Sequence, residues 1–133
     1  MHNFKDLDED FLTEPMDEVS YEGDTVEMRC DPPRGEPSAT VYWLKDNREI
    51  DTSRDSSRFQ LSNDFSLLIL MSKKEDAGNY VCVAFNQIEK RFSKPAKLTL
   101  LGKKITLTLK ILEYYAKIIN HGKQGWNLII FNF

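Results

Sequence analysis

The sequence contains few of the side chains that act as nucleophiles, general bases or metal ligands near neutral pH. There are two cysteines, Cys30 and Cys82, and two histidines, His2 and His121. The cysteines lie 52 positions apart, and by count alone they are equally well two free thiols or one disulfide. Both histidines lie outside the segment that has the composition of a domain, so no Cys–His or Ser–His pair can be assigned. No metal-ligand spacing and no glycine-rich phosphate-binding loop is present. We therefore expect a protein that is not an enzyme and that has no metal and no cofactor.

The composition is that of a chain that can fold, with 41% apolar and 29% charged residues. The net charge of −3 and the pI near 5.4 exclude a globally basic nucleic-acid binder, so we expect no nucleic-acid partner. Charge is unevenly distributed. Residues 1–24 carry nine acids and one lysine, residues 25–100 carry eleven acids and twelve bases, and residues 101–133 carry one acid and five lysines. Only the middle segment has the charge balance of a folded domain.

Short stretches of alternating polarity follow one another through this middle segment. In Thr40–Lys45, for example, Val41 and Trp43 lie on one side, and Tyr42 and Leu44 lie on the other. Turn-forming residues separate the stretches. Short strands at this spacing predict an all-β antiparallel sandwich rather than alternating strands and helices. The expected strands are Thr25–Cys30, Thr40–Lys45, Arg58–Leu61, Ser66–Leu70, Asn79–Phe85 and Glu89–Leu100.

Three parts of the chain follow from these patterns: an acidic lead-in over residues 1–10, a domain over residues 11–101, and a tail over residues 102–133. We expect the tail to be dispensable for the fold. Its composition favours translation of noncoding sequence past an exon end, that is, intron read-through. Two structural alternatives stay open. Leu107, Ile111, Tyr115 and Ile118 form one stripe of an amphipathic helix that could dock on a partner or a membrane surface, whereas alternation from Ile105 to Ile111 would suit an extra strand.

No signal peptide and no membrane-spanning segment is visible in the sequence. The longest apolar runs, residues 67–71 and 127–133, are far shorter than the roughly 20 residues that span a bilayer. A signal peptide begins with basic residues that are followed by an apolar stretch, whereas acidic residues follow Lys5 in this chain.

One constellation of residues identifies a family. Cys30 is followed by Trp43 after 13 residues, and Tyr80 stands two positions before Cys82 in the segment Asp76-Ala77-Gly78-Asn79-Tyr80-Val81-Cys82. This pattern resembles the immunoglobulin superfamily, and the spacing of the cysteines resembles its I-set type. The resemblance implies a Cys30–Cys82 disulfide between two sheets with Trp43 packed on it. It also implies a Tyr80 hydroxyl bonded to backbone, and a salt bridge between Arg58 and Asp76. The core signature is thus Trp43, Tyr80, Asp76, Gly78 and Arg58.

A longer set of motifs resembles the second immunoglobulin domain of roundabout axon-guidance receptors, from about Leu7 to Leu101. The motifs are Leu7-Asp8-Glu9-Asp10-Phe11, the loop Asp31-Pro32-Pro33-Arg34-Gly35-Glu36-Pro37 after the first cysteine, Trp43-Leu44-Lys45-Asp46 and the segment around Cys82. Glu89 departs from the family, which usually has glycine there. The resemblance implies an extracellular or cell-surface module that supports recognition of a Slit-like protein ligand and of heparan sulfate, beside neighbouring immunoglobulin domains. The alternatives are an intracellular sarcomeric or cytoskeletal I-set domain, and an immunoglobulin domain of another neural adhesion receptor.

Cationic side chains are the candidate contacts for such ligands. The rigid loop after Cys30 presents Arg34, whose planar guanidinium suits sulfate or carboxylate. The other candidates are Lys45, Arg48, Lys94 and Lys97. The competing interpretation is that these five side chains are ordinary solvated charges on outward-facing strand positions, since eleven acidic residues lie in the same segment, residues 25–100.

Overall fold

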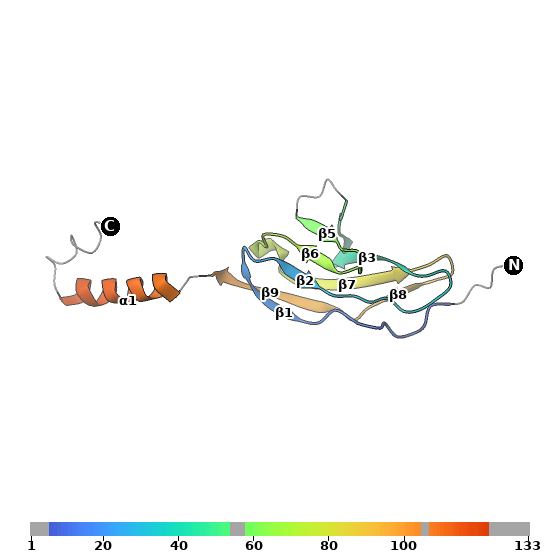
Figure 1. Cartoon of the computed structure of the whole chain (residues 1–133), viewed down its shortest axis with the longest axis horizontal. Helices are drawn as coiled ribbons and strands as arrows, with labels where there is room; N and C mark the ends of the chain where they lie inside the picture. Colours follow the sequence, from blue (N-terminus) through green and yellow to red (C-terminus); the bar gives the residue numbers. More distant parts are fainter. Residues whose placement is uncertain (1–5, 54–57, 105–106, 123–133) are drawn as a thin grey trace. The chain divides into compact units, whose positions relative to one another are not determined.

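The computed structural model describes residues 6–53, 58–104 and 107–122. The chain divides into two compact units, Met1–Lys103 and Lys104–Phe133, which are considered separately. Within the described residues, the first unit consists of strands and one short 3-10 helix, η1 (Lys74–Asp76), and the second contains the helix α1 (Leu107–Gly122) (Figure 1).

The larger sheet of the first unit has the strand order β1-β9-β7-β3-β4, and β8 also pairs with β7. All of these pairs are antiparallel except β1 with β9, which is parallel. The strands are β1 (Glu18–Glu22), β3 (Thr40–Lys45), β4 (Arg48–Glu49), β7 (Gly78–Phe85), β8 (Lys90–Phe92) and β9 (Ala96–Lys103).

The smaller sheet has the order β2-β6-β5, with both pairs antiparallel. Its strands are β2 (Val26–Met28), β5 (Phe59–Leu61) and β6 (Leu67–Ile69). The two sheets pack against each other (Figure 1), so the predicted all-β, immunoglobulin-like sandwich is confirmed.

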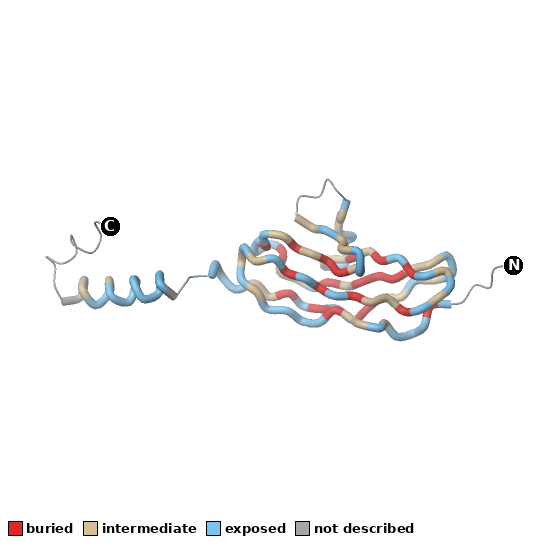
Figure 2. Tube along the Cα trace, viewed as in Figure 1, coloured by how far each residue is buried: buried red, intermediate tan, exposed pale blue. Residues whose placement is uncertain are grey.

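The core lies between the sheets because β2, β3, β6 and the start of β9 alternate buried positions with more exposed ones (Figure 2). Trp43 is 0% exposed, and its Nε1 donates a hydrogen bond to the Phe65 carbonyl at 3.0 Å. An aromatic side chain of this size contributes about 4–6 kcal/mol when it is removed from water. Alternation within the expected strands places eight residues on the inner faces, and all are buried: Val26, Met28, Val41, Trp43, Leu67, Ile69, Tyr80 and Leu98.

The Cys30–Cys82 disulfide is confirmed, with the two Cα atoms 6.4 Å apart. Cys30 follows the end of β2 and Cys82 lies in β7, so the bond joins the two sheets. Trp43 is paired in register with Cys82 on the neighbouring strand. The cross-link and the largest buried side chain therefore lie next to each other in the core.

The start of the domain differs from the expected boundary at residue 11. Leu7 is 2% exposed and belongs to the core, and the Asp8 amide donates to the Arg34 carbonyl at 2.8 Å. The packed unit thus includes part of the expected lead-in. The strand β1 was also not expected. Val19 and Tyr21 alternate with polar residues in Glu18–Glu22, but both side chains are exposed, and the strand is held mainly by its backbone pairing with β9.

The end of the domain differs in a second way, because the single strand expected over Glu89–Leu100 is divided into β8 and β9. Pro95 has no amide hydrogen to donate to a ladder, and it lies between the two strands. Ser93 bridges the interruption. Its amide donates to the Cys82 carbonyl and its hydroxyl accepts from the Cys82 amide, both at 2.9 Å.

The unusual Glu89 needs no positive φ in the turn between β7 and β8. It is not among the described residues with that conformation. The Asn86 side chain shapes this turn, since its Oδ1 accepts from the amides of Ile88 at 2.9 Å and Glu89 at 3.0 Å.

Of the two structures considered for the tail, the amphipathic helix is confirmed as α1. The extra strand is wrong for the residues from Leu107 onward. Apolar residues in this segment recur at spacings of three and four, which suit a helix, and also at a spacing of two, which suits a strand. The sequence alone therefore left the choice between helix and strand open. Ile105, which belonged to the strand pattern, lies outside the described residues.

Candidate binding surfaces

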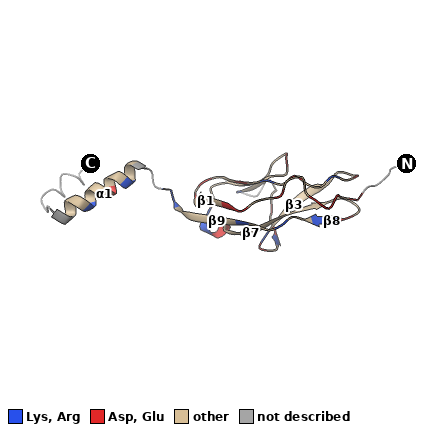
Figure 3. Ribbon diagram, turned by 90° about the horizontal axis from the view of Figure 1, so that it is seen from below, with Lys and Arg blue, Asp and Glu red and all other residues tan. Residues whose placement is uncertain are grey.

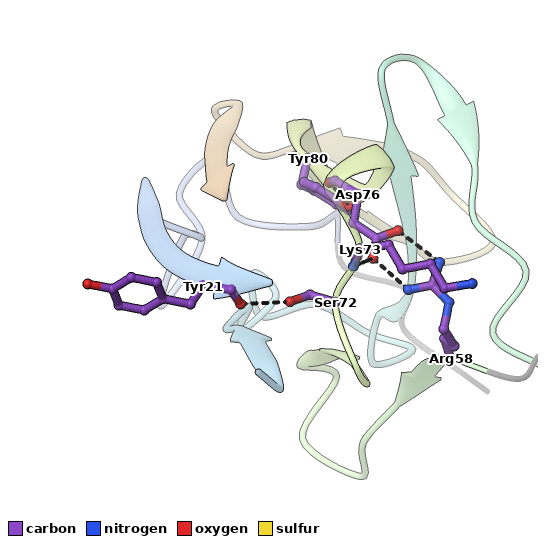
Figure 4. Close-up of polar contacts among 6 residues, drawn as sticks. All are labelled: Tyr21, Arg58, Ser72, Lys73, Asp76 and Tyr80. Carbon is purple, nitrogen blue, oxygen red and sulfur yellow. Dashed lines mark hydrogen bonds and ion pairs between the residues drawn. The ribbon is translucent and has the colours of Figure 1, made fainter. Parts of the chain in front are cut away.

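The polar residues of the signature form one network beside η1 (Figure 4). Arg58 donates to both carboxylate oxygens of Asp76, from Nη1 at 2.5 Å and from Nη2 at 2.9 Å. The Lys73 amide donates to the same carboxylate at 2.7 Å. The Tyr80 hydroxyl donates to the Asp76 carbonyl at 2.6 Å. These groups are turned toward one another, so they hold the fold and are not presented to a ligand.

The electrostatics of this network agree with a structural role. Burial alone would raise the pKa of Asp76, but the hydrogen bonds from Arg58 and the Lys73 amide, with the charge of Arg58, hold that pKa below its usual value. The Asp76 hydrogen bond raises the pKa of Arg58, and burial raises the pKa of Tyr80 well above its ordinary value. The carboxylate is therefore ionised and the phenol neutral near neutral pH.

Gly78 occupies a position that no larger residue fits. Its φ is +153°, and a Cβ added there would lie 2.7 Å from Oδ2 of Asp46. The Asp46 carboxylate is held in place because its Oδ1 accepts from the Asn79 amide at 2.9 Å, which lowers the pKa of Asp46. Glycine in the signature thus keeps room for the turn between β3 and β4.

Arg34 is exposed in the loop after β2, whose backbone is tied to residues before β1. It lines a shallow hollow of about 400 Å³. Two carboxylates, Asp31 and Asp64, line the same hollow. The guanidinium is thus presented on an ordered loop, but in surroundings of mixed charge.

Carboxylates also lie near the four other candidate residues, at the side chains of Lys45 and Arg48 and at the backbone of Lys94 and Lys97. The Nζ of Lys45 is 3.4 Å from Oδ2 of Asp46, and Arg48 shares a hollow of about 650 Å³ with Glu49 and Asp51. The backbone amides of Lys94 and Lys97 donate to the carboxylates of Glu14 at 2.6 Å and Asp17 at 2.8 Å. Basic residues mark β8 and acidic residues mark β1 (Figure 3). This mixed arrangement favours solvated charges over one continuous cationic patch.

A surface that sequence reasoning did not select lies on the outer face of the larger sheet. Cys82 and Ala84 point into the core, so Val83 between them points outward. The strand register puts Tyr42 and Phe92 on either side of Val83. We call the following set the outer-face patch: Tyr42, Leu44, Val81, Val83, Phe85 and Phe92.

The outer-face patch is packed as well as apolar. Val83 is 0% exposed although it faces away from the core, whereas Phe92 is 61% exposed. The rings of Tyr42 and Phe85 lie 5.7 Å apart between centroids, and the Lys90 ammonium lies 5.6 Å from the Tyr42 ring. Ordered aromatic side chains with a cation at the edge are typical of protein-binding surfaces. The feature of the sequence that could have revealed this patch is that β3 carries apolar residues on both of its sides.

Among the described residues, no group of three or more His, Cys, Asp and Glu side chains is placed to hold a metal ion. No helix in the described part of the chain is long and apolar enough to cross a membrane.

Comparison with known proteins supports this assignment of the fold. Residues 11–86 match the family model for an immunoglobulin domain. The chain is 39% identical over 93 residues to human Roundabout homolog 2, as the roundabout-like motifs predicted; the match covers 70% of this chain but only 6% of that receptor.

Two solved structures have the same fold. The N-terminal Ig1-2 module of the Drosophila receptor protein tyrosine phosphatase DLAR has a TM-score of 0.62 and 34% identity, covering 68% of this chain and 44% of that one. A chimeric titin Z1Z2 has a TM-score of 0.61 and 30% identity, covering 71% of this chain and 95% of that one.

Proposed function

The chain belongs to the immunoglobulin-domain family, and on that premise we propose that it is a binding module of an extracellular or cell-surface receptor. The observation that carries the proposal is the outer-face patch, an ordered set of aromatic and aliphatic side chains whose edge residue Phe92 is mostly exposed. Exposed apolar patches on a stable domain usually mark places where another protein binds.

We propose a Slit-like secreted protein as the ligand, with heparan sulfate assisting and neighbouring immunoglobulin domains completing the receptor. Similarity to human Roundabout homolog 2 supports this choice. The chain spans only 6% of that receptor, so the partners of a whole receptor extend to this chain as a proposal. In such an arrangement the domain would contribute apolar contacts through the outer-face patch, and Arg34 would contribute a cation for sulfate.

Replacing Phe92 tests the apolar surface. We expect Phe92→Asp to weaken binding to immobilised Slit at least tenfold, because a charge at the edge of an apolar interface must be desolvated. Surface plasmon resonance gives the affinity, and thermal unfolding should show a melting temperature within about 4 °C of the original, since Phe92 lies outside the core. The matched control is Met71→Asp, which alters another exposed apolar residue outside the patch. Equal affinities for the two variants would exclude the outer-face patch as the binding surface.

Replacing Arg34 tests the cationic loop separately. We expect Arg34→Ala to elute from heparin at lower salt, with a melting temperature within about 2 °C of the original, because exposed substitutions usually cost under about 0.5 kcal/mol. Arg48→Ala removes the same charge from the first residue of β4. If both variants lose retention equally, the effect is one of general charge and Arg34 has no special role; unchanged retention removes Arg34 from the binding surface.

The similarity to titin supports a second candidate, an intracellular filament domain. The Cys30–Cys82 bond discriminates between the two, because disulfides persist in the secretory route and are rare in the cytosol. Thiol titration of protein alkylated at cell lysis measures this directly. Two reactive thiols per chain would favour the filament domain, and none would favour the receptor module.

A further inference from the structure

The helix α1 presents two distinct faces along its length. At 3.6 residues per turn, successive residues are about 100° apart around the helix axis. Lys110, Glu113, Lys117 and Asn120 therefore fall within about 80° of the circumference. Six apolar residues opposite them span about 160°: Ile111, Leu112, Tyr114, Tyr115, Ile118 and the half-buried Ile119; Leu109 lies outside this arc, beside the polar stripe.

All of these apolar side chains except Ile119 are exposed in the second unit. Their exposed fractions range from 45% for Ile111 to 63% for Tyr114. A helix whose wide apolar face is open to water requires a covering surface to be stable. The pair Tyr114 and Tyr115, with rings 5.7 Å apart between centroids, has the amphipathic character of side chains that lie at a boundary between water and lipid.

The charge of α1 and its flanks is positive, in contrast to the rest of the chain. Exposed Lys104, Lys110 and Lys117 are opposed by Glu113 alone among the described residues of this unit. By sequence, residues 104–133 carry four lysines and one acid, which leaves 14 bases and 20 acids in residues 1–103. An anionic surface would thus attract the helix and repel the domain.

We propose that α1 binds to anionic lipid surfaces, with its axis in the plane of the interface. The apolar arc would enter the boundary between headgroups and acyl chains, and Lys110 and Lys117 would reach the phosphate groups with their aliphatic stems along the apolar face. A second copy of the helix is a poorer occupant, because a two-helix seam covers a narrower stripe than about 160°. A lipid boundary covers the whole arc and leaves the polar stripe in water.

Vesicle co-sedimentation of the full chain tests this proposal. With phosphatidylcholine vesicles containing about 30% phosphatidylserine at low ionic strength, we expect the chain to sediment with the lipid, and with phosphatidylcholine alone we expect at least tenfold weaker binding. The double variant Lys110→Gln, Lys117→Gln should bind about 30-fold more weakly to the anionic vesicles. The variant Ile111→Asp should lose binding, because it places a carboxylate in the apolar arc.

The matched control is Lys94→Gln with Lys97→Gln, which removes two exposed lysines from the domain and should leave vesicle binding unchanged or slightly stronger. A melting temperature equal to that of the unaltered chain shows in each case that the domain has folded. Failure of the unaltered chain to sediment with anionic vesicles overturns the proposal, as does equal loss in the control. A chain that instead dimerises in sedimentation velocity, and becomes monomeric with Ile111→Asp without binding vesicles, assigns the helix to a protein contact.

Discussion

Reduction of the Cys30–Cys82 bond should lower the melting temperature of this protein by about 20 °C or more. The bond closes a loop of 52 residues, and cross-linking a loop of that size stabilises a folded domain by about 4 kcal/mol in the chain-entropy model. That is a large share of the stability of a domain of this size, in which each kcal/mol corresponds to about 4–8 °C. Differential scanning calorimetry at matched pH, with and without reductant, measures the shift.

The double variant Cys30→Ala, Cys82→Ala separates the bond from effects of the reductant. It should melt at a similarly low temperature, and added reductant should not change its transition. Equal melting temperatures for the oxidised and reduced unaltered protein would falsify the assignment of stability to this bond.

The substitution Asp76→Asn should destabilise the domain by about 3 kcal/mol at neutral pH. It leaves the Arg58 guanidinium, which is only 22% exposed, without the carboxylate to which it donates twice. Removing one partner of a largely buried ion pair typically costs about 3–5 kcal/mol, and the partial exposure of Arg58 places the value at the low end. Urea unfolding monitored by Trp43 fluorescence gives the difference in the free energy of unfolding.

The same pair predicts a pH dependence with a definite sign. Because the pKa of Asp76 is lower in the folded state than in the unfolded chain, its ionised form stabilises the fold at every pH above about 4. The advantage of the unaltered protein over Asp76→Asn should therefore shrink as the pH falls below about 4. Glu75→Gln is the matched control: it neutralises the exposed neighbouring acid on η1 and should keep the melting temperature within about 2 °C. An advantage that persists undiminished at pH 2–3 would contradict the assignment.

The fold was predictable because its core residues form a recognisable pattern in the sequence. The spacing of Cys30, Trp43, Tyr80 and Cys82 resembles that of the immunoglobulin superfamily, and the structure buries all four residues and bonds the two cysteines. In contrast, β1 is held by hydrogen bonds to a strand about 80 residues away, and an alternation as short as that of Val19 and Tyr21 does not identify such a partner. Leu7 was assigned to the acidic lead-in although the resemblance begins there, since a single apolar residue in an acidic segment has no periodicity of its own.

The binding surfaces were less accessible to sequence reasoning than the fold. A search for cations selected Arg34, Lys45, Arg48, Lys94 and Lys97, but it did not reveal that Glu14 and Asp17, from a distant segment, bond to the backbone of Lys94 and Lys97. The outer-face patch depends on the register between β3, β7 and β8, which alternation alone does not determine.

The position of β9 has a consequence for how the chain folds during synthesis. This last strand lies between β1 and β7, so the first strand of the larger sheet has no partner until the last one is available. The inward residues Ala96 and Leu98 are also missing from the core until then. A nascent chain that ends before Lys103 would expose the apolar edge of β7 and β1 together, and it would depend on chaperones to avoid pairing with other chains. The domain can therefore be completed only after translation has passed its final strand. Residues added after Lys103 keep β9 attached to the ribosome while β9 itself leaves the exit tunnel.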